Sequence, residues 1–441
     1  MKFNGGYNVM LEGEPSPRVA PYQKPDALYL PRYSNRLDFS LVLVEDGASV
    51  VKGQVLAKDP VNFSVPLLAP MAGTVNLEFA ERHITIENLA ASSDESSADD
   101  ADPHNERAAL LRLGVWSSLA RIDNNRVPDP ERTPDGLVVS IYRFEPYHPT
   151  PEALFRDGVD DFLAGLTRLH RIFNDNPVYL VVPETDSDIK RQLQKAGADN
   201  NWLHLFEVPQ TYPFDHPGFA AQQLGLNPER CWCIDAQAVI AAHQALEFKR
   251  PYTKKIVSMS GPLAPELCHH HLPIGYPLSL LQDQENSVER RFINGGVLTG
   301  SAIGADQLGL DAECRALTVL EELTEREILA FVQPGFNKQS FTKTFTSVFK
   351  PLFREKLTTA LGGESRPCVF CGFCEQVCPV GIIPHLVYRY LDNDKPEEAY
   401  RVEFDKCIDC GLCSYVCVSK INHLKLFRAE RARAVSALIE G

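Results

Sequence analysis

Eight cysteines gathered in one short stretch near the C-terminus constrain this chain more than any other feature of its sequence. They form two runs with the spacing C-x2-C-x2-C-x3-C, the first over residues 368–378 and the second over residues 407–417. The other four of the 12 cysteines are scattered through the rest of the chain. Because a disulfide framework distributes cysteines through a small secreted chain, this concentration indicates that one segment holds a group in its thiolates.

The doubled spacing predicts two [4Fe–4S] clusters. Three cysteines at two-residue gaps wrap a tight loop around one cubane, and the fourth lies on the following helix and reaches the other cluster. We therefore expect one cluster to be held by Cys368, Cys371, Cys374 and Cys417, and the other by Cys407, Cys410, Cys413 and Cys378. Zinc is less favoured, because its sites usually show two short cysteine pairs or cysteine and histidine together. Two adjacent clusters serve one-electron transfer and do not by themselves perform substrate chemistry.

The residues within and between the two runs favour a helical ferredoxin domain. Gly372 and Gly411 follow the second cysteine of each run, where the missing Cβ lets backbone N–H groups approach the sulfides. Apolar residues recur at helical spacing over 382–391, and Pro396 with two glutamates suits the first turn of another helix. A small β-type ferredoxin would have strands between its two cysteine runs. The helical pattern instead favours an α-helical ferredoxin domain that is attached to a larger protein.

Composition and charge bound the class of protein. The 441 residues suggest about three domains, with four possible, and the formal net charge is -14. This acidic balance argues against nucleic acid as a partner, since phosphate binding needs a basic surface. No apolar run reaches the roughly 18 residues that span a bilayer, and the N-terminus lacks a secretory signal. We expect the chain to reside in the cytosol or on the cytosolic face of a membrane.

The N-terminal third is expected to be rich in strands. Residues 38–90 contain short alternating segments with glycines at turn positions, similar to the biotinyl/lipoyl barrel-sandwich fold. Lys58 is the candidate for a carried prosthetic group, but it is not central between the two halves, so a structural barrel is favoured. Residues 92–107 are acidic and serine-rich and are interpreted as an exposed connection.

From residue 136 the pattern alternates between strand and helix. Strands are expected over 137–144, 178–183 and 202–209, with helices over 151–173 and 186–197, which suits an α/β layer of Rossmann type. No G-x-G-x-x-G follows any of these strands, so the sequence predicts no dinucleotide there. Cys231 and Cys233 could be a metal pair, but a buried strand is favoured.

Residues 254–335 form a further strand-rich block that ends in a strand expected from residue 328, and the interpretation of two of its features stays open. Gly295, Gly296 and Gly300 could cradle a phosphate, but a P-loop lysine is missing and a tight turn is favoured. The stretch Cys268–His271 could bind a metal, although a loop with surface histidines is favoured.

Near the C-terminus, a basic helix could dock on a membrane or pack on the cluster domain. Its cations are Lys425, Arg428, Arg431 and Arg433.

The order of these pieces resembles the NqrA subunit of the sodium-translocating NADH:quinone reductase, the Nqr complex. Phrases that carry the resemblance are GEP at 13–15, EDG at 45–47, KGQVL at 52–56, AP at 69–70, GTV at 73–75, VSMSGP at 257–262, VLTGS at 297–301, VQPG at 332–335 and the stretch 341–349. The iron–sulfur segment departs from that family and is similar instead to the RnfC subunit of the Rnf complex. That relative also carries a glycine-rich stretch for flavin and NADH, which this chain lacks, so these two cofactors are not supported by motif.

The resemblance implies a multidomain α/β plus β fold of four domains. They are a barrel-sandwich domain with its acidic loop (1–105), a Rossmann-like α/β domain (106–253), a β-grasp, ligand-binding domain (254–340) and an α-helical two-cluster ferredoxin domain (341–441). It also implies a peripheral position on the cytoplasmic face of the bacterial inner membrane. The implied partners are integral membrane subunits, a soluble electron donor and quinone near the interface.

The favoured hypothesis is a peripheral electron-transfer subunit of an Nqr/Rnf-type respiratory complex. Such a subunit relays single electrons between a soluble donor or flavin and the quinone-reducing membrane part, coupled to Na⁺ translocation. It is therefore part of an oxidoreductase of the translocase class. One alternative is a self-contained NADH-oxidising flavin and iron–sulfur protein like RnfC. A second is a structural subunit that shapes the quinone site, with the clusters serving only to hold the fold.

Overall fold

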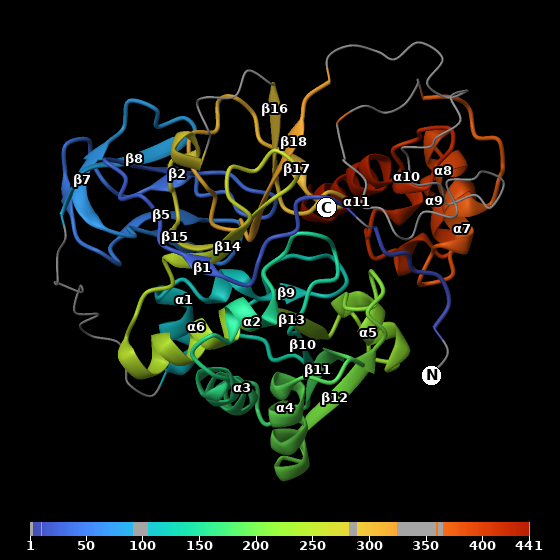
Figure 1. Ribbon diagram of the computed structural model, residues 1–441, viewed down its shortest axis with the longest axis horizontal. Helices are drawn as coiled ribbons and strands as arrows, with labels where there is room; N and C mark the ends of the chain where they lie inside the picture. The colour runs from blue at the N-terminus through green and yellow to red at the C-terminus, as the bar shows by residue number, and fades with distance from the viewer. Residues whose placement is uncertain are drawn as a thin grey trace.

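The computed structural model describes residues 3–9, 11–90, 105–281, 289–323, 359 and 365–440 of the chain (Figure 1). The acidic connection expected over 92–107 lies almost wholly outside the described residues. The strand expected from residue 328 and the phrases at 332–335 and 341–349 also lie outside them. Figure 1 shows two small sheets and the cysteine-bearing helices on opposite sides of the molecule, with the α/β layer below both.

Two small antiparallel sheets form from the N-terminal third, as the strand pattern predicts. One has the order β2 (Leu28–Pro31), β8 (His83–Ala90), β7 (Ala72–Asn76) and β4 (Ser49–Val50), and the other joins β3 (Leu41–Val42), β5 (Val55–Asp59) and β6 (Val65–Leu68). Fully buried leucines and isoleucines, among them Leu30, Leu56 and Ile84, fill the space between them. Lys58 lies inside β5, where it pairs with Leu41 and Pro66. A residue in a paired strand is not a hairpin tip, which supports a structural role for this region.

The α/β layer is built on a five-stranded sheet of order β12-β11-β10-β13-β9. Four strands are parallel, β10 (Gly136–Ser140), β11 (Val178–Pro183), β12 (Leu203–Val208) and β13 (Cys231–Asp235), and β9 (Ala120–Arg121) is antiparallel at the edge. Cys231 and Cys233 lie in β13, so the buried-strand interpretation of this pair is confirmed.

Helices connect these strands, as the alternating pattern predicts. They are α1 (Glu106–Arg112), η1 (Trp116–Ser118), α2 (Pro151–Leu154), α3 (Asp160–Ile172), α4 (Asp188–Asp199), α5 (Pro217–Gln223) and α6 (Ala236–Phe248). The single helix expected over 151–173 is wrong, because two helices occupy this stretch. Gly158, with φ 100, lies between them in a left-handed conformation that an α-helix cannot continue through.

A mixed six-stranded sheet has the order β1-β15-β14-β18-β16-β17. Its strands are β1 (Val19–Ala20), β14 (Lys254–Ser260), β15 (Cys268–Pro273), β16 (Arg290–Asn294), β17 (Ser301–Ala302) and β18 (Ala316–Glu321), with η2 (Leu278–Leu281) beside them. The pairing of β1 with β15 places residues 19–20 in this sheet and not in the two N-terminal ones. The surface-histidine loop expected over Cys268–His271 is wrong, because these residues form β15, where Cys268, His269 and His270 are buried.

The cysteine-bearing segment consists of short helices and loops, with no strand among its described residues. It contains α7 (Phe373–Gln376), α8 (Pro384–Asp392), α9 (Pro396–Arg401), η4 (Phe404–Lys406), α10 (Leu412–Tyr415) and α11 (His423–Glu440). The helices expected between the two runs are therefore confirmed. Val387, Leu391, Ala399, Phe404 and Phe427 form their common core. Within the described residues, we find no helix with both the length and the apolar character needed to cross a membrane.

A largely buried ion pair, with side chains that are 14% and 17% exposed, ties three of these regions together. The guanidinium of Arg36 contacts the carboxylate of Glu313, and it also donates to the backbone carbonyls of Ser117 (2.9 Å) and Leu119 (3.3 Å). Ser34 donates its hydroxyl to the same carboxylate at 2.5 Å. The N-terminal sheets, the α/β layer and the six-stranded sheet thus meet at one charged pair.

Candidate iron–sulfur site

Four cysteines drawn from both runs line one cavity. Cys368, Cys371 and Cys374 come from the first run, and Cys417 comes from the end of the second; His385 and His423 line the cavity with them. Cys374 lies on α7 and is buried, whereas Cys371 is exposed. The backbone N–H of Ile421 points at the Cys417 sulfur, with N and Sγ 3.4 Å apart. This is the set that the doubled spacing assigns to the first cluster.

The remaining cysteines gather around the second run. Cys407 follows η4, Cys410 precedes α10 and Cys413 lies on it. Burial, to which the nearby charge of Cys378 adds, raises the pKa of the Cys410 thiol to about 12. Burial also raises the pKa of the Cys413 thiol. The charges of four neighbouring cysteines raise it further, and these are Cys410, Cys407, Cys374 and Cys378. Cys378 of the first run therefore lies within electrostatic reach of the thiols of the second run.

The spacing of the thiols suits a cluster better than a single ion. Four sulfurs on one zinc ion lie about 3.8 Å apart, as Zn–S bonds of about 2.3 Å require. Among the described residues, no three of the eight cysteine sulfurs lie within 4.8 Å of one another. The thiols thus surround a wider space than zinc requires. The residues present fit a group with several metal atoms, each bound by a different thiolate.

Backbone conformation at each run brings donors toward the sulfurs. Gly372 (φ 76) and Gly411 (φ 78) are the N-caps of α7 and α10, in a left-handed conformation that favours glycine. Burial raises the pKa of the Cys378 thiol, while the N–H groups of Val380, Ile382 and Gly381 oppose that rise. These N–H groups favour the thiolate, which is the form that binds metal.

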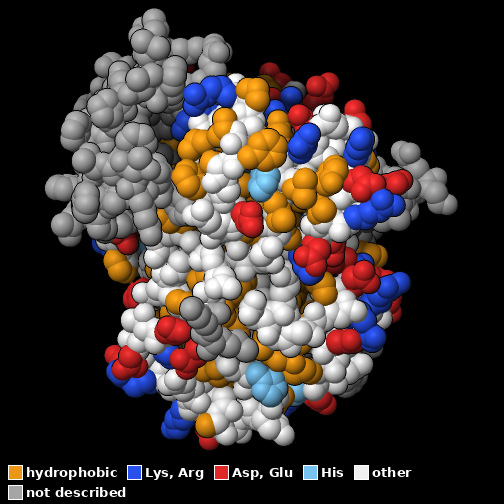
Figure 2. All heavy atoms as spheres, turned by 90° about the vertical axis from the view of Figure 1, so that its right-hand side faces the viewer, with side chains coloured by type: hydrophobic (Ala, Val, Ile, Leu, Met, Phe, Trp, Pro, Cys, Tyr) orange, Lys and Arg blue, Asp and Glu red, His pale blue; other side chains and the backbone are white. Residues whose placement is uncertain are grey.

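The two sets of cysteines differ in their surroundings. Around the first set, Val369 is 64% exposed and Phe370 is 56% exposed, and Arg389 lies over the Phe370 ring. Figure 2 views the side of the molecule that carries these helices, and hydrophobic side chains gather in its upper part. In the second set, Cys410 is buried in an apolar cluster with Phe206, Phe214 and Phe219 of the α/β layer. Cys374 of the first set belongs to the same apolar cluster, so the two sets differ in that only the first has an exposed cysteine, Cys371, beside the exposed Val369 and Phe370.

Side chains from the α/β layer and α11 hold the second run in place. Tyr212, in the loop after β12, donates its hydroxyl to the carbonyl of Cys410 at 2.6 Å. Gln222 of α5 donates to the carbonyl of Lys406 at 2.8 Å. Arg431 donates to the carbonyl of Cys407 and lies over the ring of Phe404. No spacing in the sequence links Tyr212 or Gln222 to the cysteines, so sequence reasoning did not identify either residue.

The basic C-terminal helix packs on the protein, which was one of its two expected roles. Besides the contacts of Arg431, Arg428 donates to the carbonyl of Thr299 at 3.0 Å. Arg433 pairs with Glu430 at 2.7 Å, so three of the four cations singled out in the sequence have partners within the chain. Docking of this helix on a membrane stays a prediction.

The glycine-rich loop at 295–300 already binds a carboxylate from the protein. The backbone N–H groups of Leu298 (2.9 Å) and Thr299 (2.7 Å) donate to Oε1 of Glu145, and the Thr299 hydroxyl donates to Oε2 at 2.6 Å. Burial by itself would raise the pKa of Glu145, but hydrogen bonds from His148 and Thr299 hold that pKa below its usual range. The carboxylate occupies the donors that a phosphate would need. The tight-turn interpretation of Gly295, Gly296 and Gly300 is therefore confirmed.

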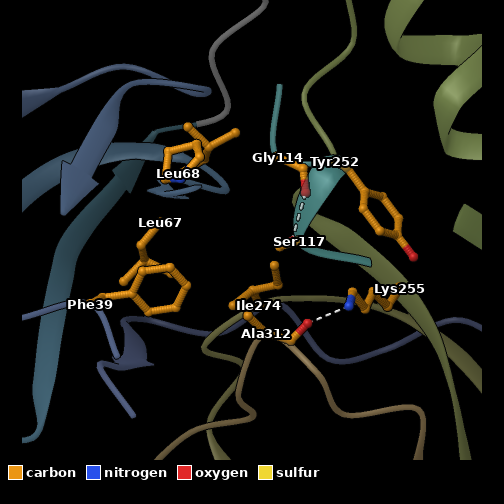
Figure 3. A pocket seen from close by; sticks show the side chains of 10 residues that line it. Phe39, Leu67, Leu68, Gly114, Ser117, Tyr252, Lys255, Ile274 and Ala312 are labelled. Carbon is orange, nitrogen blue, oxygen red and sulfur yellow. Dashed lines mark hydrogen bonds between the residues drawn. The ribbon is translucent and has the colours of Figure 1, made fainter. Parts of the chain in front are cut away.

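A second cavity lies where the N-terminal sheets, the α/β layer and the six-stranded sheet meet (Figure 3). Phe39, Leu67 and Ile274 line one part of it, and Lys255 donates to the carbonyl of Ala312 at its edge. Its volume of about 20 Å³ has room for about one water molecule. A site for an organic cofactor would need several hundred Å³, so we assign no ligand to this cavity.

Two family descriptions match separate parts of the chain. The one described as the NqrA second alpha/beta domain matches residues 102–247. The one described as a 4Fe-4S dicluster domain matches residues 367–421 and so contains all eight clustered cysteines. The α/β layer and the helical segment are thus each similar to a known family.

Similar proteins that bear the name of the NqrA subunit of Na(+)-translocating NADH-quinone reductase occur in several bacteria. The relative from Actinobacillus pleuropneumoniae serotype 5b is 31% identical over 390 residues, covering 82% of this chain and 83% of its own length. Those from Glaesserella parasuis (30%) and Haemophilus influenzae (29%) have the same coverage. Among solved structures, an NAD+-reducing [NiFe]-hydrogenase aligns with 50% of this chain and 47% of its own, at 14% identity and a TM-score of 0.37. This score is too low to support an argument.

Proposed function

Because this chain belongs to the NqrA family of Na(+)-translocating NADH-quinone reductase subunits, we propose that it is the peripheral electron-transfer subunit of an Nqr-type membrane complex. The relatives bear the name of an NADH-quinone oxidoreductase, and the dicluster segment adds a site for one-electron transfer. We propose that the chain works as one subunit of such an oxidoreductase, at the cytoplasmic face of the inner membrane, with integral membrane subunits as partners. Coupling to Na⁺ translocation and delivery of electrons to quinone would then be properties of the complex.

The proposal assigns two [4Fe–4S] clusters to crossed sets of cysteines. The first set is Cys368, Cys371, Cys374 and Cys417, and the second set is Cys407, Cys410, Cys413 and Cys378. The common cavity of the first set and the electrostatic proximity of Cys378 to the second run support this assignment. Such a cluster, when bound, accepts and releases one electron at a time.

The different exposure of the two sets supports a direction for electron transfer. The first set opens to the surface beside Val369 and Phe370, so it is the one that a partner can approach. The second set is enclosed by the α/β layer, α11 and the N-terminal residues, whose Gly6 N–H donates to the carbonyl of Val377 at 2.9 Å. We propose that electrons pass between a partner and the first set, and between the first set and the protein body at the second.

The contact of Glu145 with loop 295–300 weighs against the NADH-oxidising alternative. In that alternative, a glycine-rich stretch of this chain would have to bind flavin and NADH phosphates. Here the N–H donors of Leu298 and Thr299 are already satisfied by a buried carboxylate. A phosphate would be repelled by that charge unless Glu145 left its pocket. We therefore propose that flavin and NADH, where they take part, are bound by a partner.

An anaerobic redox titration of the complete purified complex tests the proposal. Two one-electron centres should appear by electron paramagnetic resonance, with about eight irons per chain, four for each cluster. Reduction by NADH compared with reduced ferredoxin would identify the donor side. Centres that stay silent across the full range of potentials would instead favour the structural alternative. A folded, colourless chain prepared without air would exclude the iron–sulfur assignment altogether.

A further inference from the structure

Three metal-ligating side chains converge at one edge of the six-stranded sheet, away from the eight clustered cysteines. Residues two apart in a strand point to the same side of a sheet, so Cys268 and His270 of β15 share a face. Their ligand atoms, Sγ and Nε2, lie 3.4 Å apart. Glu266 precedes the strand, and its Oε2 lies 3.7 Å from Nε2 of His270. All three ligand atoms lie within 4.8 Å of one another.

These separations are those of ligands around a single ion. Two atoms bound tetrahedrally to one zinc lie about 3.4 to 3.6 Å apart, given Zn–N and Zn–S bonds of about 2.0 and 2.3 Å. The two separations at Nε2 of His270, 3.4 Å to Cys268 and 3.7 Å to Glu266, differ from these values by little. A thiol–imidazole hydrogen bond accounts for the first separation and a histidine–carboxylate ion pair for the second, whereas one ion bound by all three groups would account for both together.

The surroundings favour a site held firmly by the fold. Cys268 is fully buried and His270 is 6% exposed, against Val257 and Met259 of the neighbouring strand β14. The apolar setting strengthens the attraction between a cation and a thiolate.

The carboxylate of Glu266 is already oriented toward the site. Arg18, just before β1, contacts Oε1 of Glu266, while Oε2 faces His270. In known metal sites, a carboxylate that binds the metal through one oxygen is often oriented by a hydrogen bond or ion pair to a neighbouring group. Two hydrogen bonds join the same stretch to the N-terminal strand: Ser16 N–H donates to the carbonyl of Leu267 at 3.0 Å, and His269 N–H donates to that of Arg18 at 2.9 Å.

We propose that Glu266, Cys268 and His270 form a zinc site, with water as the fourth ligand, that fastens the N-terminal strand to the six-stranded sheet. Thiolate, imidazole and carboxylate are the ligand types that zinc takes from proteins. Three protein ligands and one water complete a tetrahedron. The site shares no residue with the iron–sulfur proposal and stands independently of it.

Zinc X-ray absorption on the full chain, with its clusters reconstituted anaerobically, tests the proposal. After one equivalent of zinc is added and the excess is removed, we expect one bound zinc with one sulfur and about three nitrogen or oxygen neighbours. Zinc with four sulfur neighbours would show binding in the cysteine runs and would overturn the proposal. A chain that retains no zinc would overturn it as well.

Matched variants separate this site from its neighbours. Cys268→Ser and His270→Ala should abolish zinc retention, whereas His271→Ala, an exposed residue on the opposite face of β15, should keep it. If the variants at the buried Cys268 and His270 fail to fold, Glu266→Gln provides the test. This side chain is 46% exposed, so its replacement should leave the fold intact. We expect it to weaken zinc binding at least about tenfold in a chelator competition. Wild-type affinity in Glu266→Gln would refute the site.

Discussion

Replacing Glu313 with glutamine should destabilise the whole body of the protein, because this carboxylate pairs with Arg36 where three regions meet. Burial by itself would raise the pKa of Glu313, but Arg36 and Ser34 lower it from 4.5 to about 2. A difference of that size corresponds to about 3 kcal/mol of stability at neutral pH. Breaking a fully buried ion pair costs about 3–5 kcal/mol in other proteins. The lower end of that range applies here, because the two side chains are 14% and 17% exposed.

The sign of the pH dependence follows from the lowered pKa. A carboxyl with a depressed folded pKa contributes its full stability above the unfolded value, near 4.5, and loses it as the pH falls toward about 2. The difference between wild type and Glu313→Gln should therefore stay near 3 kcal/mol from about pH 8 to pH 5.5. At about pH 3.5 it should have fallen to roughly 2 kcal/mol.

Urea unfolding followed by circular dichroism across this pH range provides the measurement. Asp306→Asn is the matched control. Asp306 and Arg82 also form an ion pair between the six-stranded sheet and the N-terminal sheets, but their side chains are 51% and 65% exposed. An exposed pair should contribute less than about 1 kcal/mol. Equal losses in the two variants, or a Glu313→Gln effect that grows as the pH falls, would refute the reasoning.

Two further predictions concern the cysteines and a helix contact. Cys378→Ser should damage the cluster of the second run and Cys417→Ser that of the first, as seen by electron paramagnetic resonance; loss of its own run's cluster in each variant would contradict the crossed assignment. Gly165→Ala on α3 should lower the urea midpoint of unfolding, because the added Cβ would lie 2.3 Å from the carbonyl oxygen of Val239 on α6. This clash should outweigh the helix propensity of alanine, which exceeds that of glycine by about 1 kcal/mol. Gly197→Ala on α4, whose Cβ would meet the end of the Leu205 side chain, should be tolerated; equal effects of the two would argue against a backbone clash.

Local sequence patterns correctly predicted the helices and strands that depend on residues close together in the chain. The helices between the cysteine runs follow from apolar residues at helical spacing over 382–391 and from the proline at 396. The strands β10 to β13 follow from short apolar segments between polar turns. The resemblance to NqrA, made from ordered short phrases, is confirmed by relatives that cover most of the chain.

Other features were missed or misjudged because they depend on partners far along the chain. The stretch Cys268–His271 looks polar and exposed in the sequence, yet it is a strand buried between β1 and β14. Glu145 fills the glycine-rich loop from more than 150 residues away. The domain boundaries given from the sequence stay predictions, and the pairing of β1 with β15 crosses the first of them.

The amino-acid sequence alone predicts two iron–sulfur clusters in one short segment, because ligand type and spacing within a few residues are local properties. The exposure of Cys371, and the hydrogen bonds by which Tyr212, Gln222 and Arg431 hold the second cysteine run, became visible only in the folded chain. Exposure and long-range hydrogen bonds arise from packing between distant segments, and no local pattern encodes them.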